Sequence, residues 1–378
     1  MSDRPGRVPA LQQVPPDVVC LPDYAAHARE RLDDNAWAYL AGAAADEITL
    51  RANRAAWDQL ALVPRVLRRL TGGHTRVELL GRTLAHPLLL APVAYQRLAH
   101  PDGELASAHA AAAQGAGFIL SAQASVLMED VAQAVLPEAE RGPLWFQLYM
   151  QHDRGFTREL VQRAKAAGYE AIVLTVDAPS HGVRDRERRA QLKLPEGVSA
   201  VNLAGLPPAP RTQIDRTQSW VFDALMPDAP TWDEIDTLRS HTRLPLLLKG
   251  VMHPEDAREA QRQQVAGLIV SNHGGRTLDT AAPTAWVLPR IADAVGDAMP
   301  LLVDGGIQRG TDVLKALALG ARAVLIGRPY MHALATCGAI GVAHVLRVLR
   351  DELEVAMALC GCRTVADAGR ELFFEAPW

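Results

Sequence analysis

The sequence predicts an α/β fold in which eight parallel strands, each followed by a helix, close into a (β/α)8 TIM barrel. From about residue 88 onward, short apolar runs alternate with longer amphipathic segments. The runs are rich in leucine or β-branched residues, as in strands buried on both faces. Strands that alternate with helices pair in parallel, and eight such units favour a closed barrel. An open doubly wound sheet is the alternative.

Eight strand segments follow one another along the chain. They are Leu88–Ala94, Phe118–Ala122, Leu144–Met150, Ala171–Asp177, Leu244–Lys249, Gly267–His273, Pro300–Gly305 and Ala323–Gly327. The clearest helical periodicity between them covers Gly103–Gln114, Asp153–Ala167, Pro254–Gln264 and Thr311–Leu319. Gly320 follows the last of these segments, where glycine commonly ends a helix.

Three further segments complete one predicted domain, residues 1–378, around the barrel core of residues 88–328. Residues 1–87 form an N-terminal helical extension, with helices expected at Tyr24–Leu32 and Asn35–Ala44, that covers the floor or rim of the barrel. Residues 180–231 are a long Pro-rich insertion after strand 4, and insertions of this length are usually functional lids or disordered segments. Residues 329–378 are expected to form C-terminal helices.

Composition and charge exclude several classes of protein. There are 39 basic and 43 acidic residues, so no broad basic field is present to bind nucleic acid. The basic cluster Arg184 to Arg189 is interleaved with Asp185 and Glu187, which favours a solvated charged segment. The four cysteines form neither a CxxC pair nor a disulfide framework. The segment Met1–Pro16 lacks an apolar signal core, and charges or glycines interrupt the longer apolar runs. We expect a cytoplasmic protein with no membrane span and no metal site.

The active site of a TIM barrel lies at the carboxyl ends of its strands. In this sequence those ends carry Ala94, Tyr95, Ser121, Gln147, Tyr149, Thr175, Asp177, Lys249, His273, Asp304, Gly327 and Arg328. A barrel needs some polar residues at this end. It does not need a hydroxyl, an amide, a lysine, a histidine and two carboxylates converging on one point.

Two groups of these residues suggest a chemistry. His273 can titrate near neutrality, and Arg276, beyond two glycines, can grip a carboxylate with two hydrogen bonds. The glycine-bearing loops after strands seven and eight are the usual place for a phosphate in this fold. Lys249 is costly to bury unless it faces an anion. The alternatives are a glycine turn beside a core histidine, ordinary turn glycines and a structural ion pair. Taken together, the residues suggest flavin-dependent oxidation of an acid.

Seven segments carry a resemblance to a known family. They are APVAYQRLAHPDGE (91–104), WFQLYM (145–150), IVLTVDAP (172–179), LLLKGV (246–251), SNHGGRTLD (271–279), VDGGIQRGTDVLKALALGARAVLIGRP (303–329) and LRDELEVAMALCGC (349–362). With these segments the chain resembles the FMN-dependent 2-hydroxy-acid oxidases and dehydrogenases, which include glycolate oxidase, lactate oxidase and mandelate-type enzymes. The resemblance runs from about Asp23 to Cys362.

The resemblance implies a role for each site residue and FMN as the cofactor. His273 is the implied base, and Asp177 stabilises its protonated form. The implied substrate-binding residues are Tyr24, Tyr149, Arg184 and Arg276, with Tyr149 hydrogen-bonding near the reacting oxygen. Lys249 lies beside flavin N1, where negative charge develops on reduction. The remaining implied cofactor contacts are Pro92, Val93, Ala94, Ser121, Gln147 and Thr175 for the flavin ring, and Ser271, Asp304, Gly305, Gly306, Gln308, Gly327 and Arg328 for the ribityl chain and the phosphate.

The chain departs from the family pattern at a few positions. Gln308 stands where many members carry arginine, and we expect Arg309 to compensate. Gln123 replaces a tryptophan of the glycolate oxidase type, and His181 replaces a usually apolar residue. These two complete a predicted substrate pocket with Ala94 and Met150. The pocket favours a medium-sized acid with an aromatic or polar tail, such as a mandelate bearing a ring hydroxyl. Alternatively, Gln123 and His181 bond each other or the backbone and merely shape an apolar pocket.

The predicted reaction is the FMN-dependent oxidation of an (S)-2-hydroxy acid to a 2-oxo acid, with dioxygen accepting the electrons and giving hydrogen peroxide. His273 takes the hydroxyl proton if a hydride moves, or the α-proton if a carbanion forms. Ala94 is typical of oxidases in this family, and the insertion lacks a sustained basic anchor. The alternatives are an acceptor-linked dehydrogenase, another flavin barrel such as a prenyl-phosphate isomerase, and a scaffold without turnover. A homotetramer or octamer is implied by the resemblance alone.

Overall fold

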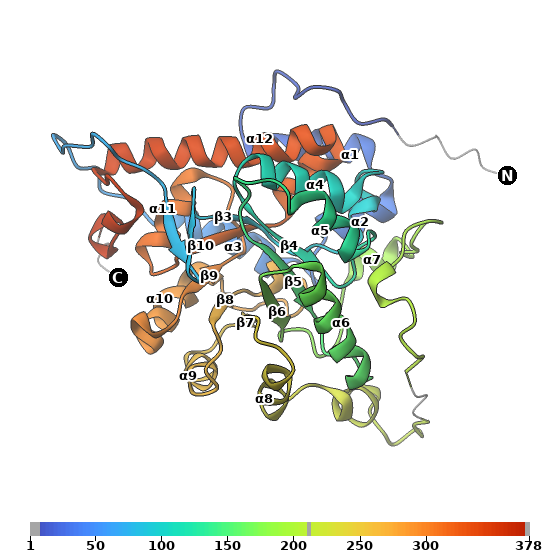
Figure 1. Cartoon of the computed structure of the whole chain (residues 1–378). Coiled ribbons are helices and arrows are strands. Elements are labelled where there is room, and N and C mark those ends of the chain that lie inside the picture. Colours follow the sequence, from blue (N-terminus) through green and yellow to red (C-terminus); the bar gives the residue numbers. More distant parts are fainter. Residues whose placement is uncertain (1–7, 210–212, 375–378) are drawn as a thin grey trace.

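The computed structural model describes residues 8–209 and 213–374, and within them eight strands close into a barrel. The barrel strands are β3 (Leu88–Leu90), β4 (Gly117–Ser121), β5 (Leu144–Leu148), β6 (Ala171–Thr175), β7 (Leu246–Val251), β8 (Gly267–Val270), β9 (Leu301–Val303) and β10 (Ala323–Ile326). Each strand pairs in parallel with its neighbours, and β10 pairs with β3 to complete the ring (Figure 1). The predicted TIM barrel is confirmed.

Most strands end earlier than predicted. β3 stops at Leu90 rather than Ala94, β6 at Thr175 rather than Asp177, and β8 at Val270 rather than His273. The residues beyond these ends leave the hydrogen-bonded ladder and continue as loops at the mouth of the barrel. The apolar pattern therefore located each strand, but most of the predicted strands extended into loop residues that form the site.

Side chains from the strands fill the interior of the barrel and close its amino-terminal end. Leu89, Ile119, Val173 and Leu247 belong to one buried cluster inside the ring. A hairpin of β1 (Val77–Leu79) and β2 (Arg82–Leu84) adds apolar side chains to the same cluster. The barrel is therefore plugged at its floor, and only the end where the strands finish is left to hold a ligand.

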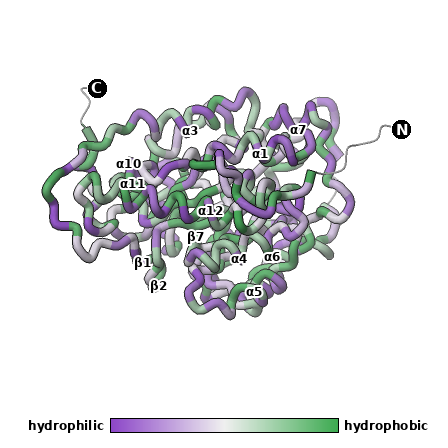
Figure 2. Tube along the Cα trace, turned by 90° about the horizontal axis from the view of Figure 1, so that it is seen from above, coloured by the Kyte–Doolittle hydropathy of each residue, from purple (hydrophilic) through white to green (hydrophobic). Residues whose placement is uncertain are grey.

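Helices cover the outside of the barrel. They are α4 (Gly103–Ala113), α5 (Met128–Val135), α6 (Arg154–Ala167), α8 (Asp233–Ser240), α9 (Pro254–Arg262), α10 (Thr284–Val295), α11 (Gly310–Ala318) and α12 (Arg328–Cys360). Hydrophilic and hydrophobic stretches alternate along them (Figure 2), as expected where one face is buried. The side chain of Asp153 caps the start of α6. Gly320 adopts φ 107° just beyond α11, as the sequence predicted.

The N-terminal extension forms α1 (Tyr24–Arg31), α2 (Asp34–Ala41) and α3 (Ile48–Gln59). α1 packs along α12, and α2 lies against α7 (Asp185–Arg189), the first helix of the insertion (Figure 1). The rest of the insertion holds only short helical turns, η3 (Val201–Leu203), η4 (Trp220–Leu225) and η5 (Met226–Asp228). Residues 210–212 of the predicted insertion and residues 1–7 of the predicted extension lie outside the described ranges.

The chain after the barrel is dominated by α12, which is followed by the turns η8 (Val365–Asp367) and η9 (Arg370–Leu372). α12 is kinked at Cys337 and Gly338. It is the one helix in the described residues long and apolar enough to cross a membrane, by length and composition alone. In the folded chain, however, 61% of its most apolar window is buried against the rest of the protein. This burial is typical of a core helix.

Candidate active site

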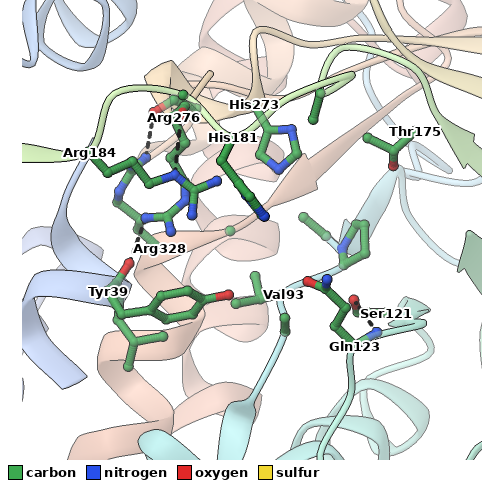
Figure 3. Close-up of a pocket in the computed structure, with 18 of the residues that line it drawn as sticks. Tyr39, Val93, Ser121, Gln123, Thr175, His181, Arg184, His273, Arg276 and Arg328 are labelled. Atoms are coloured by element: carbon green, nitrogen blue, oxygen red, sulfur yellow. Dashed lines mark hydrogen bonds between the residues drawn. The ribbon is translucent and has the colours of Figure 1, made fainter. Parts of the chain in front are cut away.

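A cavity of about 1260 Å³ opens at the carboxyl ends of the strands (Figure 3). All of the predicted site residues except Tyr24, Asp177 and Ser271 line it. Pockets that hold one small molecule usually measure about 300–1,000 Å³. The cavity is therefore large enough for a cofactor and a substrate together.

The centre of the site is a hydrogen-bonded pair formed by His273 and Asp177. The Nδ1 atom of His273 lies 2.9 Å from a carboxylate oxygen of Asp177, which sits behind the histidine and outside the cavity lining. Burial lowers the pKa of His273, and this outweighs the opposing effect of Asp177. The imidazole is therefore neutral at neutral pH, with Nδ1 engaged and Nε2 left to take a proton.

Local backbone geometry places this pair. His273 adopts φ 57°, which is unusual for a residue with a side chain, and its N–H donates to the Ser271 hydroxyl at 3.0 Å. Gly250 in β7 has φ 109°, and a Cβ there would lie 2.4 Å from that of Asp177. Only glycine at position 250 lets the carboxylate approach the strand closely enough to reach the histidine.

Lys249 is buried at the end of β7 beside a carboxylate. Its ammonium donates to the Ser271 hydroxyl at 2.9 Å and lies 3.2 Å from Asp304. Burial alone lowers the pKa of Lys249, but Asp304 and Asp177 outweigh it, so the pKa is raised. Lys249 thus stays protonated and presents a positive charge to the cavity, even though it is also part of a structural ion pair.

The resemblance implies that Ser271 contacts the ribityl chain or the phosphate, and the structure places it directly behind Lys249 and His273. The residue is fully buried and does not line the cavity. Its hydroxyl accepts from both Lys249 and the His273 backbone, so it supports these residues from behind.

Three polar side chains at neighbouring strand ends form a connected row. The hydroxyl of Ser121 donates to the side-chain oxygen Oε1 of Gln147 at 3.1 Å, and Nε2 of Gln147 donates to the Thr175 hydroxyl at 3.0 Å. All three are buried and face the cavity. The row offers fixed donors and acceptors to the edge of a flat heterocycle.

The loops after β9 and β10 form a cradle for an anion. Gly306 has φ 84° and packs against α3, and a Cβ added at Gly327 would meet no atom within 4 Å. Arg328 has no carboxylate partner among the described residues, and its Nε is buried without a hydrogen bond. Burial and the neighbouring Arg276 lower the pKa of Arg328 to about 9. A phosphate at the start of α12 would relieve this uncompensated positive charge.

The expectation that Arg309 compensates for Gln308 is wrong. Arg309 points away from the cavity and pairs with Glu352 at 2.8 Å. The other arginine that lines the cavity at the cradle is Arg54 of α3, which donates to the Gly306 carbonyl at 2.6 Å and is paired with Asp312 and Asp58. Sequence reasoning misses Arg54, because α3 lies some 250 residues before the loop that it contacts.

Arg184 and Arg276 lie together on one side of the cavity, next to Arg328 (Figure 3). Arg276 stacks over the ring of Tyr39, 4.9 Å from its centroid, and donates to the Tyr39 carbonyl. A single oxygen of Glu187 accepts from both Arg184 and Arg276. The predicted solvated segment is therefore only partly solvated, because Arg184 and Glu187 turn inward.

Tyr24 was predicted to hold the substrate, and the structure contradicts this. Its side chain is fully buried between α1 and α12, where its hydroxyl bonds to His344 at 2.9 Å, outside the cavity. The tyrosine that lines the cavity is Tyr39 of α2. No sequence signal singles out Tyr39; it reaches the cavity because α2 is docked there, with the carbonyls of Tyr39 and Gly42 accepting from Arg276.

Tyr149 lines the cavity as predicted and remains protonated. Burial and the nearby Asp177 raise the pKa of Tyr149 to about 12. Its phenol therefore acts as a hydrogen-bond donor to an oxygen of a bound ligand throughout the neutral range.

Gln123 and His181 face the cavity (Figure 3), and Met150 and Ala94 line it as well. Neither the amide of Gln123 nor the imidazole of His181 has a hydrogen-bond partner within the described residues. The alternative in which they bond each other or the backbone is therefore not what the structure contains. Both side chains can pair with a ligand.

A barrel with an anion cradle after its last two strands, a histidine–carboxylate pair and two arginines defines an oxidoreductase of the flavin-binding TIM barrel class. The chain belongs to the FMN-dependent dehydrogenase family, which it matches over residues 28–375.

The chain is 47% identical over 355 residues to an L-lactate oxidase of Alicycliphilus denitrificans, covering 94% of this chain and 96% of the relative. It is 45% identical to a 4-hydroxymandelate oxidase of Amycolatopsis orientalis, covering 93% and 97% of the two chains. A solved structure of mandelate oxidase with benzoyl-formic acid superposes with a TM-score of 0.83 at 44% identity, covering 93% of this chain and 97% of that one.

FMN is the cofactor of this family, and the residues present fit it. One carboxylate oxygen of Asp304 is buried without a partner, which suits a ribityl hydroxyl. Arg328 and the N-terminus of α12 suit the phosphate. The row formed by Ser121, Gln147 and Thr175 suits the polar edge of the isoalloxazine ring, with Lys249 beside it.

Proposed function

We propose that this chain oxidises a medium-sized (S)-2-hydroxy acid to its 2-oxo acid and passes the electrons to dioxygen, giving hydrogen peroxide. FMN-dependent oxidation of a 2-hydroxy acid is the reaction of its family. One observation carries the proposal: a neutral, Asp177-backed His273 lies in the same cavity as Arg184 and Arg276.

Each side chain has a task in this reaction. Arg184 and Arg276 bind the substrate carboxylate, and the phenol of Tyr149 donates to the substrate oxygen. Nε2 of His273 accepts the proton that leaves the substrate, and Asp177 stabilises the resulting imidazolium. Bound FMN supplies the two-electron acceptor for this oxidation. Lys249 places positive charge where negative charge develops in the reduced site.

The unpartnered groups of Gln123 and His181 support a substrate with a polar or aromatic tail. Gln123 is partly buried, and a buried donor or acceptor left without a partner costs about 1–3 kcal/mol, so a tail that pairs with its amide is favoured. His181 is exposed and lines the same cavity, where its imidazole offers such a tail a second hydrogen-bonding group. Met150, Leu192 and Leu225 add apolar area to the same cavity. A mandelate with a ring hydroxyl meets both demands, and one relative bears the name 4-hydroxymandelate oxidase.

The names of the relatives support dioxygen over another acceptor. The relatives include oxidases of L-lactate and of 2-hydroxy acids. An acceptor-linked dehydrogenase is the second candidate. A prenyl-phosphate isomerase has no use for the paired arginines that line this cavity.

We further propose a cytoplasmic homotetramer, or an octamer made of two such tetramers. The location is supported by the four cysteines, which are all free and buried. The assembly is supported only by the family resemblance. Light scattering at micromolar concentration tests it, and a stable monomer would contradict it.

Turnover with a panel of acids tests the function. The purified protein should be yellow, release FMN on denaturation, and bleach anaerobically with its substrate. Among glycolate, lactate, mandelate, 4-hydroxymandelate and 2-hydroxyoctanoate, we expect the highest kcat/KM for 4-hydroxymandelate, with peroxide formed in equal amount to the 2-oxo acid. A preference for glycolate would contradict the enlarged pocket, and a preference for 2-hydroxyoctanoate would contradict the polar tail.

A further inference from the structure

Glu187 places a carboxylate of the chain itself between the two substrate-binding arginines. Its Oε1 accepts from Nη2 of Arg276 at 2.9 Å and lies 3.4 Å from Nη1 of Arg184. The Glu187 side chain is only 13% exposed, so the contact is largely shielded from water. The reaction described above assigns no task to this acid.

The hydrogen bonds of Arg276 show what Glu187 leaves free. A guanidinium has five N–H donors. Nη1 of Arg276 uses both of its hydrogens on the carbonyls of Tyr39, at 2.5 Å, and Gly42, at 2.9 Å. Glu187 takes one hydrogen of Nη2, and Nε has no partner in the described residues. A substrate carboxylate can therefore bind Arg276 through Nε and Nη2 while Glu187 stays close by.

The position of Glu187 on α7 makes the contact specific. α7 has no buried side chain, and it starts directly after Arg184. The other acid of this helix, Asp185, faces Arg188 and Arg189 at the surface, 3.2 and 3.6 Å away. Of the two acids on α7, Glu187 alone reaches the arginines of the cavity.

We propose that Glu187 is an internal counter-carboxylate that competes electrostatically with the carboxylate of the substrate. In the free enzyme it offsets one of the two positive charges of Arg184 and Arg276. When a substrate binds, two carboxylates share the same two cations and repel each other across a few ångströms of low-dielectric space. Glu187 thus stabilises the free site and holds the affinity for a monocarboxylate below what the arginines alone would give.

The inference rests on the proposed function in one respect, because it requires the substrate to bind through its carboxylate. The expected effect depends on the charge of the ligand. Glu187 weakens the binding of anions, and it disfavours a second carboxylate on the substrate more than a neutral tail. A neutral ligand in the same place is indifferent to the charge on residue 187.

Titration of the FMN-loaded holoenzyme tests the inference. The probe is 2-hydroxy-2-methylpropanoate, which has no hydrogen on its α-carbon and so cannot be oxidised, and the readout is the flavin absorbance spectrum. Glu187→Gln keeps the size and the hydrogen-bond acceptor but removes the charge. We expect its Kd for the probe to fall on the order of tenfold. The Kd for the neutral amide of the probe should not change.

Two further variants make the result specific. Asp185→Asn removes an acid from the same helix without touching the cavity arginines, and its Kd should equal that of the wild type. Glu187→Ala should also tighten binding if the charge is what matters. In rapid-reaction kinetics with an oxidisable acid, the larger part of the change should fall on the substrate Kd rather than on the limiting rate of flavin reduction.

Each outcome decides the point. Weaker binding in Glu187→Gln would overturn the inference and make Glu187 a residue that orients the arginines. Unchanged binding, or an equal shift for the acid and the amide, would also overturn it. If no 2-hydroxy acid reduces the wild-type flavin, the proposed function fails, while the titration with the inert acid still reports on Glu187.

Discussion

Two walls of the same cavity are built in different ways. Gln147, Thr175 and Lys249 on the strand ends are at most 5% exposed, and each is hydrogen-bonded or paired within the chain. The wall from the insertion carries His181 without a partner and α7 without a buried side chain. Proton transfer needs fixed geometry, which the barrel supplies, whereas loops can vary without disturbing the core. We infer that the residues at the strand ends, the first wall, carry out the reaction. The insertion, the second wall, selects the substrate.

Among the changes at the strand ends, replacing the base should lower the rate of reaction the most. In His273→Asn, we expect the rate of anaerobic flavin reduction to fall by about 10²–10⁴-fold, because the proton acceptor is gone. FMN affinity should stay near that of the wild type, since the cradle at Gly306 and Arg328 is untouched. Stopped-flow absorbance gives the rate, and fluorescence on FMN release gives the affinity. Near-normal reduction in this variant would remove His273 from the mechanism.

The acid behind the histidine should have the second-largest effect, visible in the pH profile. His273 must be neutral to act, so flavin reduction falls as the pH drops through its pKa, which burial holds below the ordinary value. Asp177 opposes that lowering, so Asp177→Asn should move the midpoint of the profile to still lower pH. The plateau rate should also fall, by about ten- to a hundredfold, since the imidazolium loses its stabilising charge. A midpoint that moves to higher pH would contradict this electrostatic account.

The same two walls differ in how well the sequence predicts them. Strand periodicity fixed where Lys249 and Asp304 lie, because side chains at parallel strand ends must converge. The choice between Tyr24 and Tyr39 could not be made in this way, since both lie on helices outside the barrel repeat. Tyr39 reaches the cavity because α2 is docked against Arg276. This arginine follows α2 by more than 200 residues in the sequence and donates to the carbonyls of Tyr39 and Gly42.

Charged residues of the insertion show the same limit. In the sequence, the acids and bases between Arg184 and Arg189 suggest a solvated segment. The side chain of Arg188 is indeed exposed to solvent. Glu187 turns inward only because Arg276, on another loop, offers it a partner. A short polar helix has no apolar stripe from which its buried face can be inferred.

The smallest expected effect lies in the second wall and separates recognition from reaction. His181→Leu removes a partner for a polar tail while keeping the volume of the side chain roughly constant. One lost hydrogen bond is worth about 0.5–1.5 kcal/mol, so kcat/KM for 4-hydroxymandelate relative to mandelate should fall about two- to tenfold. Glycolate, which has no tail, serves as the control, and its kcat/KM should stay unchanged, because Arg276 and His273 still hold and deprotonate it. Gln123→Trp should instead penalise both aromatic acids against glycolate by filling the space they need. If His181→Leu lowered kcat/KM equally for all three substrates, the imidazole would take part in the reaction itself. The assignment of His181 to substrate selection would then be wrong.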